Sequence, residues 1–89
     1  MNANDRRTLR AILNTLHDLR SRMADAAPDL DALASAEREK VDNMPDSLRE
    51  SDRGQEMEEQ CDTLETAYSD LESALDSIED ALNSLDDLL

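Results

Sequence analysis

Apolar residues recur along the second half of the chain at alternating steps of four and three, the spacing of one helix face. Between Gly54 and Leu89 every step fits a single seven-residue repeat. The members are Met57, Cys61, Leu64, Tyr68, Leu71, Leu75, Ile78, Leu82, Leu85 and Leu89. A repeat of this length predicts a helix over about residues 53–88 that packs along a seam, and it outweighs a composition close to that of disordered chains.

The first half of the chain has a shorter pattern that is interrupted at Pro28. Residues 5–26 are predicted to form an amphipathic helix whose apolar face is Leu9, Ile12, Leu16, Leu19, Met23 and Ala26. Proline suits the first turn of a helix, so a second helix is expected over about residues 28–43. Its thinner stripe is Leu30, Leu33, Ala34 and Val41. Pro45 disfavours helical geometry just before it, so a structured corner is expected over 44–53, with Leu48 as its apolar anchor.

These elements predict an all-α fold, an antiparallel helical bundle or coiled-coil-like hairpin with one long C-terminal helix, forming a single domain. The first two helices together match the long helix in residue count and would fold back against it. The core and oligomer seam is expected to consist of Leu64, Leu71, Leu75, Ile78, Leu82 and Leu85. Such a core is small and contains no Phe or Trp, so we expect homodimerisation along the exposed remainder of the seam.

The composition argues against several classes of protein. One glycine and two prolines provide few tight turns for a β-rich fold, and one aromatic residue, Tyr68, provides no surface for stacking bases. We therefore expect no direct binding of nucleic acid. No apolar run is long enough for a membrane span or a secretory signal, and the single Cys61 cannot form an internal disulfide. A cytoplasmic location, inside a host cell, is the corresponding expectation.

The 23 acidic and nine basic residues give a formal charge of −14, and they are unevenly distributed. All basic residues lie in 1–53, whereas residues 54–89 hold 12 acids and no Lys or Arg. One position beside the seam is acidic in every repeat: Glu58, Glu65, Glu72, Glu79 and Asp86. Ordinary bundle electrostatics could account for this row, because Arg6, Arg20 and Arg22 would flank the seam. It does not account for the acids that point away from the core.

Those outward acids suggest a mimic of DNA. Twelve charges on a helix of about 52 Å give one per roughly 4.3 Å, against about 3.4 Å between phosphates on one DNA strand. Such a rod could occupy a channel lined with Lys and Arg in a basic nucleic-acid-binding protein. The residues expected to make contact are Glu59, Asp62, Asp70, Asp76, Asp80 and Asp87. The alternative is a face adapted for solubility or high salt, for which eight Arg to one Lys would also be typical.

The corner carries a resemblance. Asp42-Asn43-Met44-Pro45, Leu48, Ser51 and Arg53-Gly54, followed by acidic heptads, resemble a hairpin in small acidic helical proteins of phages and prophages. That setting includes anti-CRISPR and anti-restriction inhibitors, so the resemblance implies a CRISPR effector or another host defence nuclease as partner. A structural or adaptor coiled coil of a phage is the alternative, and it would hold a partner helix with Leu75, Ile78, Leu82 and Leu85.

Candidate catalytic and metal-binding residues are few. His17 is expected on the outward side of the first helix, with no Cys, His or acidic cluster to complete a metal site. Cys61 and Tyr68 occupy seam positions and are expected in the core. Two-carboxylate catalysis needs a pocket that separates the two pKa values, which a straight helix face does not provide. We therefore expect no enzyme activity, no metal and no cofactor.

Overall fold

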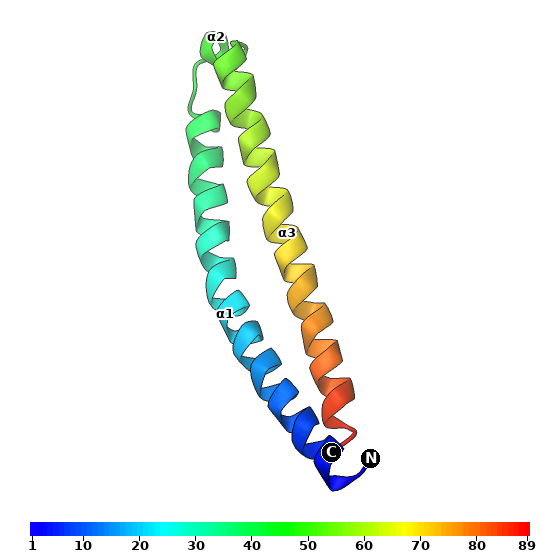
Figure 1. Cartoon of the computed structure of the whole chain (residues 1–89). Helices are drawn as coiled ribbons and strands as arrows, with labels where there is room; N and C mark the ends of the chain where they lie inside the picture. The colour runs from blue at the N-terminus through cyan, green and yellow to red at the C-terminus, as the bar shows by residue number, and fades with distance from the viewer.

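The chain folds into a hairpin of two long helices that lie side by side (Figure 1). The computed structural model describes all 89 residues and contains α1 (Ala3–Asp42), the short α2 (Asp46–Arg49) and α3 (Asp52–Asp86). The rod measures 68 × 15 × 15 Å. Both termini lie at the end far from α2, which we call the open end, and α2 lies at the corner end. The predicted all-α hairpin with one long C-terminal helix is confirmed.

Side-chain caps fix where the two long helices begin. Asn2 Oδ1 accepts a hydrogen bond from the Asp5 amide at 2.8 Å, so α1 starts slightly earlier than the predicted residue 5. Ser51 Oγ accepts one from the Gly54 amide at 3.2 Å and starts α3. In both cases a side-chain oxygen satisfies an amide that the first helical turn leaves without a partner.

The predicted division of the first half into two helices is wrong, because α1 is continuous through Pro28. Proline has no N–H to donate to the carbonyl of Ala24, and one bond of the helical ladder is lost. Ala27 and Ala34, on either side in the chain, are only 5% and 4% exposed. Packing on both sides of the proline therefore keeps the helix intact, and α1 is bowed along its length (Figure 1).

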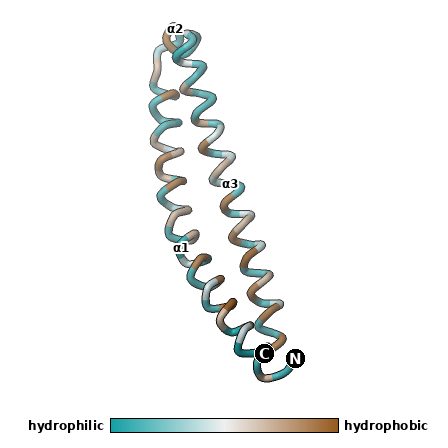
Figure 2. Tube along the Cα trace, viewed as in Figure 1, coloured by the Kyte–Doolittle hydropathy of each residue, from teal (hydrophilic) through white to brown (hydrophobic).

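The seam of α3 follows the predicted heptads, but that of α1 is shifted from the prediction. Cys61 and Leu82 are buried, and the other seam leucines of α3 are half-buried. On α1 the inward residues are Leu9, Leu13, Leu16, Arg20, Met23, Ala27, Leu30, Ala34, Glu37 and Val41. They follow the same four-and-three spacing, and apolar segments recur along both helices in Figure 2. Ile12 and Leu19, predicted to be inward, are 47% and 44% exposed.

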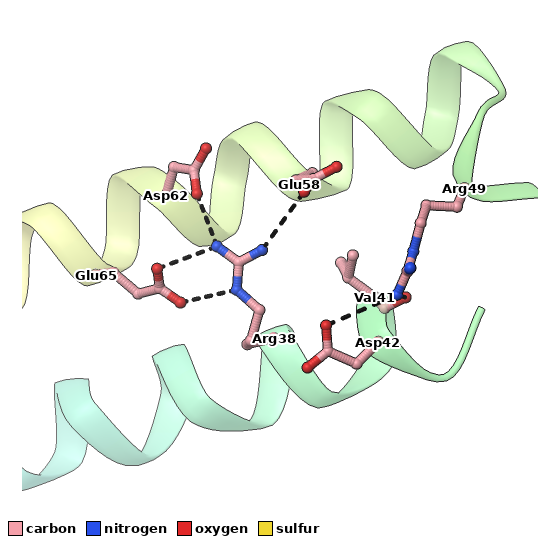
Figure 3. A network of polar contacts seen from close by, with 7 residues as sticks. All are labelled: Arg38, Val41, Asp42, Arg49, Glu58, Asp62 and Glu65. Carbon is pink, nitrogen blue, oxygen red and sulfur yellow. Dashed lines mark hydrogen bonds and ion pairs between the residues drawn. The ribbon is translucent and has the colours of Figure 1, made fainter. Parts of the chain in front are cut away.

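The corner depends on a close approach between the backbone of α2 and the start of α3, rather than on its apolar residue. Leu48, the predicted anchor, is 53% exposed. A Cβ on Gly54 would collide with the Leu48 carbonyl oxygen and would lie 2.6 Å from that of Arg49, so only glycine fits here. The Arg49 guanidinium Nη2 donates a hydrogen bond of 3.1 Å to the Val41 carbonyl and ties α2 to the end of α1 (Figure 3).

Candidate functional site: the acidic side of α3

All six residues predicted to contact a partner lie on α3 or at its C-terminal cap, and all six are exposed. They are Glu59, Asp62, Asp70, Asp76, Asp80 and Asp87. A helix rises about 1.5 Å per residue, so the six residues are spread over roughly 42 Å of α3 rather than gathered at one point. The candidate site is therefore a strip and not a pocket.

Near the corner end, one arginine of α1 binds three carboxylates of α3 (Figure 3). Arg38 Nε and Nη2 donate to the two oxygens of Glu65 at 2.8 and 3.0 Å, and Nη2 also reaches Asp62 at 2.7 Å. Glu58 lies 3.9 Å from Nη1. We call these four residues the Arg38 cluster. The prediction that Asp62 is free for a partner is wrong, because this carboxylate is already paired within the chain.

The geometry of the Arg38 cluster shifts the pKa values of Arg38 and Glu65. The hydrogen bonds from Arg38 hold the pKa of Glu65 below its usual range. The hydrogen bonds that Arg38 donates to Glu65 and to Asp62 raise the pKa of Arg38. Fork-like contact between a guanidinium and a carboxylate is the strong form of such a pair. These carboxylates therefore belong to the fold, fixing the axial position of α1 against α3.

Of the three arginines predicted to pair with the acidic row beside the seam, only Arg20 does so. Arg20 reaches Glu79 at 3.3 Å across the seam. Arg22 instead pairs with Asp18 in its own helix at 3.2 Å, and Arg6 makes no ion pair. Arg38, which sequence reasoning did not select, makes most of the contacts. A reader of the sequence could have found it as the basic residue three before Val41, beside the true seam of α1.

Toward the open end, the acids of α3 other than Glu79 have no basic partner. Glu79 is the one residue of this part with an ion pair. We call the remaining acids of residues 70–87 the open-end strip: Asp70, Glu72, Asp76, Asp80, Asp86 and Asp87. Over about 26 Å of helix this is one unpaired charge per roughly 5 Å, against about 3.4 Å between phosphates on one DNA strand. Glu59 is also unpaired but lies nearer the corner.

Tyr68 marks the boundary between these two parts of α3. Its hydroxyl donates to Glu72 at 2.7 Å, and this hydrogen bond raises the pKa of Tyr68. Glu72 is therefore the member of the open-end strip whose carboxylate accepts a hydrogen bond from a neutral partner. The remaining members make no side-chain hydrogen bond within the chain.

The opposite side of the hairpin has a different character. A groove of about 680 Å³ near the corner is lined by Leu33 and Leu64 together with Glu37, Glu56, Glu59, Gln60 and Thr63. Leu33 is 50% exposed there. Exposed apolar residues continue from this groove along α1, where Ile12 and Leu19 also face outward.

The residues considered for other chemistry take structural places. Cys61 is 1% exposed, and burial raises the pKa of its thiol, so it is held as a neutral apolar group. His17 is exposed. No group of three or more His, Cys, Asp or Glu side chains is arranged to hold a metal ion. Neither long helix contains a stretch apolar enough to span a bilayer.

Comparison of the chain with protein-family models, curated proteins and solved structures gives no match. The candidate site therefore rests on the contacts and charges of this chain's own residues.

Proposed function

We propose that the protein is an acidic DNA mimic that binds the nucleic-acid-binding site of a basic partner protein, without enzymatic activity of its own. The observation that supports this most is the open-end strip, six exposed carboxylates without a basic partner that follow one another along a single stiff helix. Arg and Lys side chains that bind phosphates would bind these carboxylates through the same charge-assisted hydrogen bonds. The resemblance of the corner to phage proteins makes a CRISPR effector or another host defence nuclease the favoured partner.

The strip is unfavourable for the chain itself, which supports a role outside the fold. Asp86 and Asp87 lie at the negative end of the α3 dipole, which costs about 0.3 to 1 kcal/mol each. Asp76 and Asp80 are like charges four residues apart, a further cost of a few tenths of a kcal/mol.

The test is a triple neutralisation in the strip, D76N/D80N/D87N, compared with a matched triple elsewhere, D25N/E39Q/E50Q. All six positions are exposed and free of ion pairs, and both variants change the net charge equally. We expect the strip variant to unfold at the same or a higher urea concentration, because repulsion is removed. It is nevertheless expected to lose binding, so misfolding cannot explain the loss.

Binding is measured by adding each variant to DNA cleavage by CRISPR effectors and restriction nucleases of the host. A mimic inhibits in competition with DNA, and the inhibition weakens as salt rises. The control triple is expected to inhibit as the natural chain does. Equal inhibition by both triples, or inhibition that excess duplex DNA does not relieve, would contradict the proposal.

A structural or adaptor role is the second candidate, and the exposed Ile12, Leu19 and Leu33 favour it. An adaptor would be indifferent to neutralisation of the strip and would depend on apolar contact. Unfolding at low salt that neutralisation relieves would instead indicate adaptation to high salt.

A further inference from the structure

The two sides of the seam between α1 and α3 differ in kind. On one side the rows beside the seam carry the Arg38 cluster and the acidic residues Glu58, Glu65, Glu72 and Glu79. On the other side the rows are apolar, and we call them the apolar flank. Its members, at seven-residue spacing, are Ile12, Leu19, Ala26 and Leu33 on α1 and Ala67, Ala74 and Ala81 on α3.

The two rows of the apolar flank are brought together by the hairpin. Leu33 and Gln60, which directly precedes the alanine row in the repeat, line the same groove. Counting heptads from this point in an antiparallel pair places Ala26 level with Ala67, Leu19 with Ala74 and Ile12 with Ala81. In two of these layers, Leu19 with Ala74 and Ile12 with Ala81, a large side chain of α1 is thus level with a small one of α3.

We propose that the apolar flank is the interface with a second copy of this chain, forming a four-helix bundle in which α1 of each copy packs against α3 of the other. The large residues of α1 would fill the space left by the alanines of the facing α3, the size complementarity that packed helices require. The seam itself is used within the chain, so the expected homodimer does not form along it.

The hairpin alone leaves its apolar residues incompletely covered. Seven apolar residues are buried in the whole chain, while Leu16, Leu64, Leu71, Leu75 and Ile78 along the seam are only half-buried. A second pair of helices over the flank would cover these leucines as well as the exposed Ile12 and Leu19. The whole face of the rod that carries the flank, with extents of 68 and 15 Å, offers about 1,000 Å² per copy, and the flank itself, over about 32 Å of α1, is roughly half of it. Stable interfaces bury roughly 800 Å² per partner.

The distribution of charge favours one direction for the second copy. The row of α3 just beyond the alanines contains Thr63, Ser77 and Ser84 and only two acids, Glu56 and Asp70. Most of the 12 acids of α3 therefore lie away from the alanine row, and the acids nearest the flank are Glu37, Glu56 and Glu59 in the groove at its corner end. α1 has seven basic and eight acidic residues, so it is nearly neutral, whereas α3 has a single basic residue, Arg53. Copies that point in the same direction place α1 against α3, which avoids contact between the two acidic helices.

The first experiment measures mass by sedimentation over a concentration series for the natural chain, for I12Q/L19Q/L33Q and for the control L48Q. Leu48 is as exposed as the flank residues but lies at the corner. We expect a dimer for the natural chain and for L48Q, and a dissociation constant at least about tenfold higher for the triple variant, which retains its helix content. A natural chain that stays monomeric, or a triple variant that dimerises as tightly, would overturn the proposal.

The second experiment tests direction with single cysteines in a C61A background. An equal mixture of A26C chains and A67C chains is oxidised, so that any disulfide must join two molecules. Same-direction packing predicts the mixed disulfide. A disulfide between two A67C chains, in place of the mixed one, would show that the acidic helices adjoin and would overturn the direction.

Salt separates this proposal from the proposed function. Two copies carrying −14 each repel, so added salt is expected to tighten the dimer. The same salt is expected to weaken a mimic's contact with a cationic partner. The open-end strip is outside the flank, so D76N/D80N/D87N is expected to dimerise at least as well as the natural chain. Weaker dimerisation on raising salt would contradict an apolar interface, whatever the outcome for the mimic.

Discussion

The corner end and the open end of the hairpin are built from the same repeat but are held together differently. At the corner end the side chains between the helices are small, Val41 and Cys61, and Arg38 binds Glu65 and Asp62 within 3.0 Å. At the open end Leu9, Leu13 and Leu82 form the core cluster, with Leu16, Ile78 and Leu85 against it. A single ion pair, Arg20 with Glu79 at 3.3 Å, crosses the seam there.

This contrast shows that evenly distributed acids can have different roles in one helix. Where α1 offers a guanidinium at the right level, the carboxylates of α3 become part of the fold. Where it offers none, they stay exposed and without an ion pair. The candidate site is accordingly the open-end half of α3, rather than its whole length as the sequence suggests.

The most damaging change is expected at the corner, from Gly54→Ala. The added Cβ meets the backbone of Leu48 and Arg49, which cannot move without opening the turn. We expect a loss of about 3 kcal/mol in the free energy of unfolding, at the upper end of overpacking costs. Urea unfolding followed by circular dichroism measures it. Gln55→Ala, one residue further along the same turn, is the control and is expected to change little. Equal stability of the two variants would mean that the close crossing is not required.

The open end is expected to depend on Leu82. This residue is 3% exposed within the leucine cluster, so Leu82→Ala is expected to cost about 2 to 3 kcal/mol through lost burial and the remaining cavity. Leu88, 54% exposed and six residues further along the chain, is the control. Leu88→Ala is expected to cost less than about 0.5 kcal/mol. If the two variants unfold alike, the leucines do not hold the open end.

A smaller loss is expected from Arg38→Gln, which converts the corner end into a copy of the open end. Glu58, Asp62 and Glu65 would then lie close together without a counter-charge. Arg22→Gln removes the same charge but breaks only an ion pair within α1, so it is the control. We expect Arg38→Gln to lower the urea midpoint more than Arg22→Gln does. The reverse order would mean that the Arg38 cluster does not join the helices.

Much of the α3 half of the fold could be predicted from the sequence, because its seam positions are apolar without exception. The α1 half could not, for two physical reasons. Its true seam includes the polar residues Arg20 and Glu37, so the seven-residue repeat is not evident from apolar residues alone. Ile12 and Leu19, which lie beside the seam, form a more hydrophobic face that is predicted incorrectly to be the inward one. Packing of Ala27 and Ala34 against α3 also outweighs the preference of Pro28 for a helix start.

The sequence predicts where the acids of the candidate site lie, but not which of them are free of ion pairs within the chain. Heptad counting placed Asp70, Asp76, Asp80 and Asp87 on the outer side of α3, and they are exposed and unpaired there. The same counting placed Asp62 with them. Asp62 pairs with Arg38 because of the axial position of α1 beside α3. That position follows from the shifted seam of α1 and could not be deduced from the composition.

The smallest expected effect is a pH dependence confined to the corner end. Arg38 lowers the pKa of Glu65, so the stability from this pair is complete above the ordinary glutamate pKa of 4.5 and is lost as pH falls through the lowered value. We therefore expect the difference in unfolding free energy between the natural chain and Glu65→Gln to be constant near neutral pH and to shrink in acid. Repulsion among the other carboxylates also changes with pH, but it affects both chains and cancels in the difference. Urea titrations of both chains at a series of acidic pH values measure it. A difference that stays constant down to the most acidic pH would show that the Arg38 contact contributes nothing through charge, leaving the buried Val41 and Cys61 to hold the corner end alone.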